Sequence, residues 1–479
     1  MNPPPAVIGS RTLPWRHQAE AVAFVRQLYR RGKRGAMIAA VMGTGKSAMT
    51  VYLCVEEGFQ MILVLCPLRV VQVWRPQFEI HSDVPFLVVP LDDSFASVRA
   101  KRAEAERQMA LAKARGVPIV VVINYDSAWR SSFAEWALKQ KWDLVVADEC
   151  HRLKCPGGKA SRYVARLGQA ARFRLGLSGT PMPHSPLDVY AYFRFIDPSI
   201  FGWSFHKFRQ HYAVMGGYQN HQVVGYRNLD ELNRKFYSVT FACGKDVLDL
   251  PEELEVTYRC ELGAEARRIY LALKKDLIAD VGAGAVTAAN ALVRLLRFAQ
   301  LTGGFLRTDG GEQIQIDTAK MELLRDVLED LDPTEPVVVF ARFRNDLDAV
   351  HRVAADLGRG SLEISGRRDE LRDWQSGAAP ILAAQIQAGG VGIDMTRSRY
   401  AIYYSIGFSL GEFLQSKARL HRPGQRRTTE FIFLAAANTV DEQILRALAA
   451  RQDLVESVLA QTIGTAGNGP ARNRPQRNE

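Results

Sequence analysis

A glycine-rich turn followed by a lysine and a serine is the first feature of the sequence that could do chemistry. It follows an apolar run, residues 37–41, precedes a segment with helical periodicity, and reads Gly43, Thr44, Gly45, Lys46 and Ser47. Glycines let backbone N–H groups approach phosphate oxygens, and the new helix directs its positive end at them. The lysine would reach the β- and γ-phosphates, and the serine would bind Mg²⁺. The context predicts a phosphate-binding loop, although the strict pattern has glycine where this chain has Ala40.

Two adjacent carboxylates form a second reactive group. Asp148 and Glu149 follow the apolar run 144–147 and precede His151. A carboxylate at the end of a strand can hold Mg²⁺ through a water, and its neighbour can orient or deprotonate the water that attacks a phosphate. The alternative is a pair of solvated acids before a helix, but the apolar run and the basic residues that follow favour the functional interpretation. Together with the phosphate loop they predict a site that binds ATP and Mg²⁺ and hydrolyses ATP.

The elements that must position these residues are short apolar runs that alternate with helical segments. The runs cover residues 37–41, 61–66, 119–123, 144–147 and 174–177 in the first part of the chain and 337–340, 362–364, 380–384, 400–404 and 430–434 in the second. This alternation predicts an α/β fold with parallel sheets covered by helices on both faces. Ligands bind such sheets at the carboxyl ends of the strands, where the polar clusters fall.

The length of 479 residues exceeds one ordinary core, so we expect two or three domains. We predict a flexible N-terminus over residues 1–12, a first lobe over 13–185, helical insertions and a linker over 186–330, a second lobe over 331–464, and a disordered basic tail over 465–479.

Composition excludes several classes of protein. Hydrophobic residues make up 47% and charged residues 24% of the chain, as in a globular protein. No apolar run approaches the roughly 20 residues of a membrane span, and the start lacks a signal-peptide pattern, so we expect a cytoplasmic protein. The six cysteines form no C-x-x-C pair, which favours reduced thiols over a zinc site or disulfides. The net charge of +11 permits a polyanionic partner without requiring one.

Several ordered motifs together carry a family resemblance. They are the phosphate loop, the acidic box 148–151 (Asp-Glu-Cys-His), the run 178–181 (Ser-Gly-Thr-Pro), the run 387–396 (Gln-Ala-Gly-Gly-Val-Gly-Ile-Asp-Met-Thr) and the run 415–425, which has the pattern Q-x-x-x-R-x-x-R-x-G-Q. In this order the chain resembles helicase superfamily two, in its DEAD/DEAH-box-like part. The last pattern, with the runs 152–154 and 245–251, is similar to the Swi/Snf-type branch of DNA translocases. The resemblance covers roughly residues 13–450 and looks most like compact phage or bacterial members.

This resemblance implies two tandem RecA-like lobes and a nucleotide site between them. It implies that Gln18 reads the adenine and that Gly392 belongs to the nucleotide-binding set. It also implies that Arg419 and Arg422, one helical turn apart, act with Gln415 from the second lobe as arginine fingers on the γ-phosphate. The residues that link nucleotide and DNA would be Ser178, Gly179 and Thr180.

The resemblance further implies a DNA face built from strand-end loops. The implied DNA-binding residues are Arg69, Asn124, Tyr125, Arg342, Gln387, Gly389, Gly390 and Thr396. Contacts of this kind carry no sequence information, so binding would be sequence-tolerant and salt-dependent. We interpret Trp129, Trp136 and Trp203 as core residues rather than base-stacking residues. The helical segment 94–115 is expected to face water.

The predicted function is an ATP-driven motor that translocates along double-stranded DNA and remodels DNA or protein–DNA complexes. We expect it to act as a monomer. The alternatives are a strand-separating helicase, a nucleotide-switched binding module, and the motor subunit of a repair or restriction complex. Departures from the family pattern are Cys150 in place of alanine, Asp394 in place of asparagine, and a short interval between Arg342 and Gln387.

Overall fold

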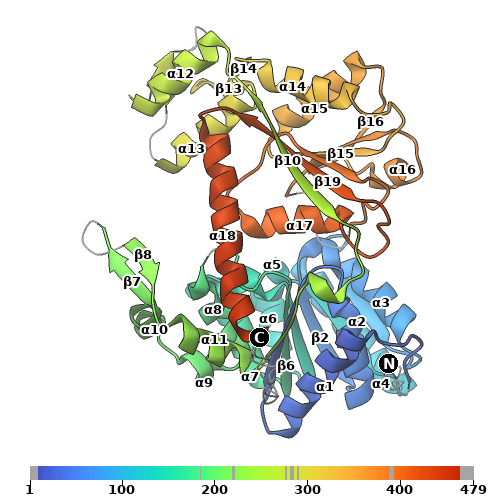
Figure 1. The fold of residues 1–479 in the computed structure, drawn as a ribbon. Helices are drawn as coiled ribbons and strands as arrows, with labels where there is room; N and C mark the ends of the chain where they lie inside the picture. The colour runs from blue at the N-terminus through green and yellow to red at the C-terminus, as the bar shows by residue number, and fades with distance from the viewer. Residues whose placement is uncertain are drawn as a thin grey trace, which may run out of the picture. The chain divides into compact units, whose positions relative to one another are not determined.

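The computed structural model describes residues 9–183, 185–217, 222–275, 278–280, 285–287, 291–387 and 393–463 (Figure 1). The chain divides into two compact units, of which the first holds nearly all residues up to Gly244 and the second holds Lys245–Ala449. Each unit has its own parallel sheet. The predictions for residues 1–8 and for the tail 465–479 lie outside the described residues.

The sheet of the first unit has seven strands in the order β3-β4-β2-β5-β6-β1-β9, and all neighbours are parallel. The strands are β1 (Gly35–Ala40), β2 (Met61–Cys66), β3 (Leu87–Leu91), β4 (Ile119–Asn124), β5 (Leu144–Asp148), β6 (Phe173–Ser178) and β9 (Thr240–Cys243). The five apolar runs predicted in this part all form strands. They are apolar throughout because helices cover both faces of the sheet.

Helices lie on both sides of this sheet, with α1, α2 and α3 on one side and α6, α7 and α8 on the other (Figure 1). The helices of the first unit are α1 (Arg16–Arg30), α2 (Lys46–Glu57), α3 (Trp74–His81), α4 (Val98–Arg115), α5 (Tyr125–Ala128), α6 (Ser131–Ala137), α7 (Lys159–Ala170), α8 (Val189–Ile196), α9 (Pro198–Phe201), α10 (Phe205–Tyr212) and α11 (Leu229–Tyr237). Short 3₁₀ segments are η1 (Leu68–Val73), η2 (Cys150–Leu153) and η3 (Pro186–Asp188), and a hairpin is formed by β7 (Ala213–Gly216) and β8 (Gln222–Tyr226).

Two details of the first unit differ from the sequence-based expectations. Residues 9–12, expected to be loose, are tied to the unit: Ser10 bridges to Ser82, and the Thr12 hydroxyl lies 2.8 Å from the Tyr52 hydroxyl. Of the three tryptophans interpreted as core, Trp136 is buried and Trp129 is half-buried, but Trp203 is 65% exposed. The core interpretation is therefore wrong for Trp203.

The sheet of the second unit has six parallel strands in the order β10-β19-β18-β15-β17-β16. The strands are β10 (Glu253–Cys260), β15 (Val337–Ala341), β16 (Ser361–Ile364), β17 (Ile381–Gln385), β18 (Tyr400–Tyr403) and β19 (Thr429–Ala436). All five predicted runs form strands. The α/β fold class with two parallel sheets is confirmed.

Strand β10 and strand β9 both come from the stretch 186–330, which was predicted to hold only helices and a linker. That prediction is wrong in this respect, because the stretch supplies one edge strand to each sheet. Edge strands face solvent and need no continuous apolar run, and β10 carries charged residues along its length. The third strand missed by the pattern, β3, contains Pro90 and is also an edge strand, where proline is tolerated.

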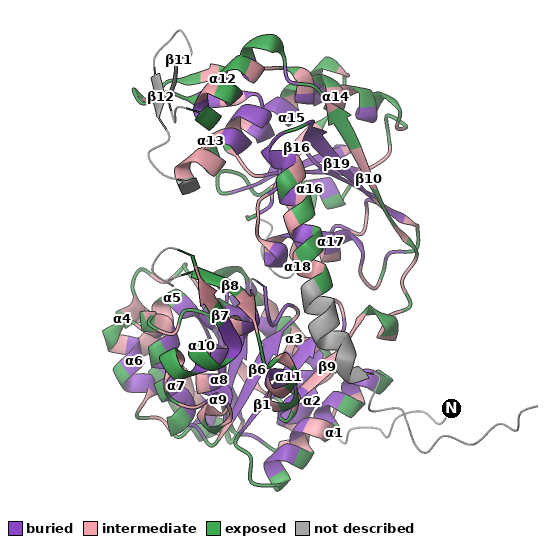
Figure 2. Ribbon diagram, turned by 60° about the vertical axis from the view of Figure 1, so that its left-hand side comes forward, coloured by how far each residue is buried: buried purple, intermediate pink, exposed green. Residues whose placement is uncertain are grey.

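Side chains of the second sheet alternate between two covering layers. Val337 and Val339 pack with α14 and α15 in one core, while Phe340 points to the opposite face and stacks on Tyr403 at 5.2 Å. Figure 2 shows β19 largely buried, whereas the edge strand β10 is exposed or half-buried along most of its length. The helices of this unit are α12 (Ala264–Lys275), α13 (Ala291–Thr302), α14 (Ala319–Glu329), α15 (Arg344–Asp356), α16 (Leu371–Gln375), α17 (Leu410–Leu420) and α18 (Val440–Ile463), the last continuing beyond the unit. The remaining elements are η5 (Lys245–Val247), β11 (Ile278–Asp280), β12 (Ala285–Thr287), β13 (Phe305–Arg307) and β14 (Gln313–Gln315).

Within the described residues, no helix combines the length and the apolar composition that crossing a membrane requires.

Candidate active site

The phosphate loop joins β1 to α2 and has the backbone that an anion cradle needs. Gly43 and Gly45 have φ angles of +86° and +83°, which residues with a side chain rarely adopt. Helix α2 begins at Lys46 with Gly45 as its N-cap, and no side chain caps its first N–H groups. These N–H groups and the helix dipole suit a phosphate. The Lys46 ammonium donates to the carbonyl of Ala40 at 2.9 Å and lies over the loop, and Ser47 follows it in the first turn.

Gln18 lies directly against this loop. Its side chain is buried, and its Oε1 accepts the N–H of Trp15 at 2.9 Å at the start of α1. A Cβ atom added to Gly45 would lie 2.3 Å from the Gln18 Nε2, so only glycine allows this approach. The structure therefore brings together the residue implied to read adenine and the loop predicted to hold phosphate, although they are far apart in sequence.

The two carboxylates lie at the carboxyl end of β5, in the centre of the sheet. Both Asp148 and Glu149 are buried, and Glu149 has a left-handed backbone with φ of +51°. Such a backbone is costly for a residue with a side chain and clusters at functional sites. Burial is the main cause that raises the pKa of Asp148, and the negative charge of Glu149 raises it further. The positive charge of Lys46 acts in the opposite direction. A nearby Mg²⁺ would reverse it, because the cation favours the ionised carboxylate.

Glu149 is connected to the loop that follows β6 through two side chains. His151 Nδ1 lies 3.3 Å from Glu149 Oε2 and 2.9 Å from the Ser178 hydroxyl oxygen, which also accepts the N–H of Thr180 at 3.1 Å. Burial lowers the pKa of His151, so the imidazole is neutral at pH 7. Glu149 Oε2 is buried and has no hydrogen-bond partner among the described residues, which leaves an acceptor for a water. The acidic box and the Ser178–Thr180 loop therefore form one connected unit.

The predicted DNA-binding residues Asn124 and Tyr125 have buried side chains that are engaged inside the first unit. Asn124 Oδ1 accepts a hydrogen bond from the buried Lys101 ammonium at 3.3 Å, and the Tyr125 hydroxyl donates to the carbonyl of Asp148 at 2.7 Å. In this arrangement the two side chains hold the end of β4 against Lys101 and the acidic box. The pattern could not show this, because Lys101 lies in a helix that is otherwise largely exposed. Arg69 of η1, in contrast, is exposed.

The arginines of the second unit are not on one helical face as predicted. Arg419 is in the last turn of α17 and is buried, whereas Arg422 follows the end of the helix at Leu420. The helix ends ahead of Pro423 because the residue that precedes a proline, here Arg422, is disfavoured in a helical conformation. Arg422 Nη1 donates to the carbonyl of Ile393 at 3.2 Å, and its buried Nε has no partner among the described residues. Gln415 is half-buried on α17.

The last glutamine of the 415–425 run fastens this segment to the run 387–396. Gln425 Nε2 donates to the carbonyls of Ser398 at 2.8 Å and Thr396 at 3.2 Å. The N–H and hydroxyl of Thr396 donate to Asp394 Oδ1 at 2.9 and 2.7 Å, so the aspartate that replaces the usual asparagine stabilises a turn. Gln387 is exposed. The predicted residues Gly389, Gly390 and Gly392 lie outside the described residues.

Arg342, at the end of β15, is held through its backbone. Its N–H donates to the Ser405 hydroxyl oxygen at 2.8 Å, and that hydroxyl donates to the buried Asp346. The guanidinium stacks over Phe343 at 5.2 Å. Burial raises the pKa of Asp346 to about 7, against the effect of its hydrogen bonds from Ser405 and Phe343.

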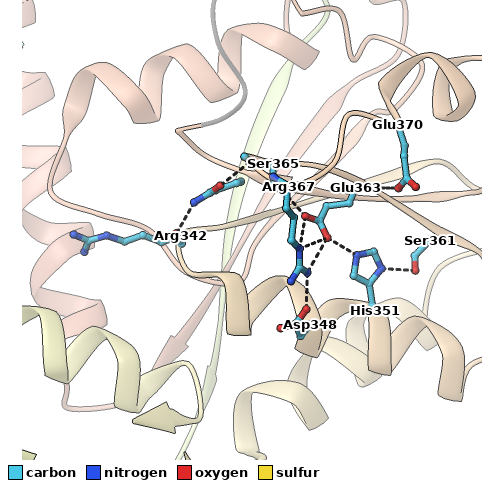
Figure 3. Close-up of polar contacts among 10 residues, drawn as sticks. Arg342, Asp348, His351, Ser361, Glu363, Ser365, Arg367 and Glu370 are labelled. Atoms are coloured by element: carbon cyan, nitrogen blue, oxygen red, sulfur yellow. Dashed lines mark hydrogen bonds and ion pairs between the residues drawn. The ribbon is translucent and has the colours of Figure 1, made fainter. Parts of the chain in front are cut away.

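A buried carboxylate on β16 was not predicted. Figure 3 shows Glu363 of β16 accepting hydrogen bonds from Arg367 and from His351 Nε2, the latter at 3.1 Å. Burial acts to raise the pKa of Glu363. Hydrogen bonds from Arg367, Ser365 and His351 outweigh this effect and bring the pKa to about 2. Gln385 links the carbonyl of Arg342 to the N–H of Gly366, so the ends of three neighbouring strands, β15, β17 and β16, are fixed together.

The raised pKa of Asp346 makes the stability of the second unit depend on pH. The folded pKa of about 7 exceeds the unfolded value of about 3.9, so between these values the unfolded chain has lost the proton that the folded chain keeps. Stability therefore falls as pH rises from 4 to 7 and is constant above. The loss amounts to at most about 4 kcal/mol. We expect Asp346→Asn to remove this fall, as measured by urea unfolding monitored through hydrogen exchange in α15 between pH 4 and pH 8.

The matched control is Asp373→Asn, which removes an exposed carboxylate of α16 in the same unit. It should keep the pH dependence of the parent chain. If Asp346→Asn and Asp373→Asn gave the same pH profile, the assignment to Asp346 would be wrong.

The comparisons with known proteins place this geometry in a family. Residues 17–301 match the SNF2-related domain, and residues 319–424 match the helicase conserved C-terminal domain. The first match covers more than half of the chain, so the chain belongs to the SNF2-related family of helicase superfamily two. The two matches follow one another along the chain, and each of the two units carries a parallel sheet with covering helices.

Particular relatives are distant. The chain is 21% identical over 461 residues to an uncharacterized ATP-dependent helicase of Mycoplasma genitalium, covering 94% of this chain and 42% of that protein. It is 25% identical to protein p41 of Acyrthosiphon pisum secondary endosymbiont phage 1, and the match covers 85% of this chain and 90% of that protein. It is 26% identical to the chromodomain-helicase-DNA-binding protein 1-like of Mus musculus, and the match covers 92% of this chain and 50% of that protein. The chain thus spans half or less of the length of the helicase relatives, but most of the phage protein.

Among solved structures, the Sulfolobus solfataricus SWI2/SNF2 ATPase core in complex with dsDNA is similar with a TM-score of 0.44 and 20% identity, over 96% of this chain and 95% of that chain.

Proposed function

We propose that the chain is an ATP-driven motor that moves along double-stranded DNA without separating its strands. The observation that carries the proposal is the connected group at the carboxyl edge of the first sheet. There Lys46 and Gln18 lie at the phosphate loop, the carboxylates of Asp148 and Glu149 lie at the end of the central strand, and Glu149 is joined to Ser178 through His151. This arrangement suits ATP hydrolysis coupled to a second event.

The residues fit ATP with Mg²⁺, since an uncapped helix N-terminus, a lysine and a buried pair of carboxylates face one edge of the sheet. Ser47 and Asp148 would hold Mg²⁺, which when bound neutralises charge on the phosphates. Lys46 binds the β- and γ-phosphates, and Gln18 pairs with the adenine edge. Glu149 orients the attacking water and accepts its proton at Oε2, which contacts His151 at 3.3 Å but makes no hydrogen bond within the described residues.

Arg419 and Arg422 complete the proposed reaction from the second unit. A guanidinium stabilises the negative charge that spreads over the γ-phosphoryl oxygens in the transition state. Because Lys46 and Ser47 belong to the first unit and these arginines to the second, hydrolysis would depend on both units. That requirement is what would convert ATP hydrolysis into movement.

The DNA partner is proposed from basic and polar residues at strand ends, the exposed Arg69 and Gln387 and the half-buried Arg342, and from the net charge of +11. The mouse relative carries DNA-binding in its name, and the pattern at 415–425 resembles duplex translocases. Backbone contacts would make binding sequence-tolerant. We propose that the chain acts as a monomer in the cytoplasm.

The deciding experiment compares the ATPase rate with duplex DNA, single-stranded DNA, forked DNA and RNA, and then asks whether the chain displaces the third strand of a triplex. Stimulation by duplex together with triplex displacement supports the translocase. A failure to displace the third strand, with unwinding of a tailed duplex, would instead support a strand-separating helicase.

Ser178 provides a test of coupling. Ser178→Ala removes the hydroxyl that joins His151 to the N–H of Thr180. A lost buried hydrogen bond of about 1–1.5 kcal/mol corresponds to roughly a tenfold effect. We expect about a tenfold lower DNA-stimulated ATPase rate and a DNA-independent rate within about twofold of the parent.

The control for this variant is Ser131→Ala, which removes an exposed hydroxyl at the start of α6 in the same unit. It should leave both rates unchanged. Equal losses of the stimulated and unstimulated rates in Ser178→Ala would show that Ser178 supports the site but does not couple it to DNA.

A further inference from the structure

The β7–β8 hairpin and helix α10 carry an unusual distribution of charge. Residues 198–229 contain Lys207, Arg209 and Arg227 together with three histidines, and no aspartate or glutamate, although the whole chain has 51 acidic residues. Neither the nucleotide site nor the strand-end loops use this stretch. A basic stretch of sequence without acidic residues is suited to contact with a polyanion.

The hairpin has a fixed base and an exposed outer part. At the base, Tyr212 and Phe208 are buried with their rings 4.9 Å apart, and the N–H of Arg227 donates to the carbonyl of Tyr212 at 3.0 Å. Figure 1 shows the two strands extending from α10 as a two-stranded ribbon. The hairpin is therefore held by the core of the first unit and does not depend on its outer side chains for its position.

The outer part of the ribbon exposes apolar side chains. Val214, Val223 and Val224 are 41%, 39% and 61% exposed, and Trp203, just before α10, is 65% exposed. Figure 2 shows the strand β8 with exposed residues. These side chains add nothing to the core of the unit, so their exposure calls for a partner.

The cations beside the ribbon are available for such a partner. Lys207 is exposed and Arg209 is half-buried, and no carboxylate of the described residues lies within ion-pair distance of either. The next acids along the chain, Asp230 and Glu231, are in the first turn of α11, and Glu231 is engaged by His211 at 2.7 Å and by Lys235 at 2.8 Å.

We propose that the β7–β8 ribbon, with Trp203, Lys207 and Arg209, is a second DNA-contact surface that places the ribbon in a groove of the duplex. This rests on the proposed function, because it assumes that DNA is the substrate. A two-stranded ribbon fits the major groove, apolar side chains contact sugars and bases there, and flanking cations bind phosphates. The absence of acids over 32 residues, 198–229, favours DNA over a protein partner.

The test measures affinity for a duplex at several salt concentrations with the double variant Lys207→Glu/Arg209→Glu. Loss of two phosphate contacts should reduce the slope of log affinity against log salt by about 2 and weaken binding at low salt about tenfold or more. The ATPase rate without DNA should stay that of the parent. The control, Lys113→Glu/Arg115→Glu, reverses two exposed cations of α4 in the same unit and should keep the parent slope.

A second variant, Val214→Ser/Val224→Ser, tests the apolar part of the surface. It should weaken duplex binding severalfold with the salt slope unchanged, because no phosphate contact is lost. If the parent binds duplex and the charge-reversal variant binds it with the same affinity and slope, the second surface is overturned while the motor stands. A parent chain without affinity for DNA at low salt overturns both proposals.

Discussion

Replacing Glu149 with glutamine is expected to lower the DNA-stimulated ATPase kcat by about 10²- to 10⁴-fold, the range over which a general base contributes. Glutamine keeps the size of the side chain and its place beside the neutral His151, but it cannot accept a proton at Oε2. ATP binding should be retained, so single-turnover phosphate release separates this effect from a loss of binding. This expectation is supported by the left-handed backbone at this position and by a carboxylate oxygen that makes no hydrogen bond within the described residues.

The control for this variant is Glu135→Gln, which changes an exposed carboxylate of α6 in the same unit and should keep the parent rate. Phosphate release by Glu149→Gln at the parent rate would remove the basis for the assigned site, since no other residue of the acidic box carries a comparable role.

Replacing Arg422 with alanine is expected to lower kcat by about 10³-fold, as for the loss of an arginine finger. ATP binding should persist, as measured with a fluorescent nucleotide, because Lys46, Ser47 and Gln18 belong to the first unit and Arg422 to the second. Its buried Nε without a described partner is a donor that a phosphate oxygen could use. Arg422→Lys should recover little activity, since an ammonium keeps the charge but lacks the planar fork of donors.

Arg426→Ala is the matched control for the finger, because it removes an exposed arginine four residues further along the same segment. Its kcat should stay within about twofold of the parent. A similar small change in Arg422→Ala would exclude Arg422 from the reaction and leave Arg419 as the remaining candidate.

The sequence predicted the central strands of both sheets because strands buried on two faces need continuous apolar runs. It did not predict β3, β9 and β10, which lie at sheet edges: β3 contains a proline, β10 carries charged residues, and β9 has only four residues. The phosphate loop and the acidic box were predicted because their residues are contiguous. The links from His151 to Ser178 and from Tyr125 to Asp148 were not, since they depend on which strands become neighbours and in what register.

The register explains the first of these links. Strand β5 pairs with β6 so that Asp148 is opposite Leu177, and this places Ser178 beside the residues that follow Asp148. No local pattern contains that information. The same limit applies to Glu363, whose ligands on α15 and the following loop come together only in the folded second unit.

Strand β10 has a consequence for how the protein is made. It is the first strand of the second sheet to leave the ribosome, yet in the sheet order its neighbour is β19, the last, over the full register from Glu253 with Thr429 to Cys260 with Ala436. During synthesis the backbone hydrogen-bonding groups of β10 therefore stay unpaired until about 170 further residues have been made and β19 emerges. Pairing over so long a loop is slow and favours aggregation of unfinished chains. Chains truncated before residue 429 would keep that open edge permanently and should accumulate in inclusion bodies.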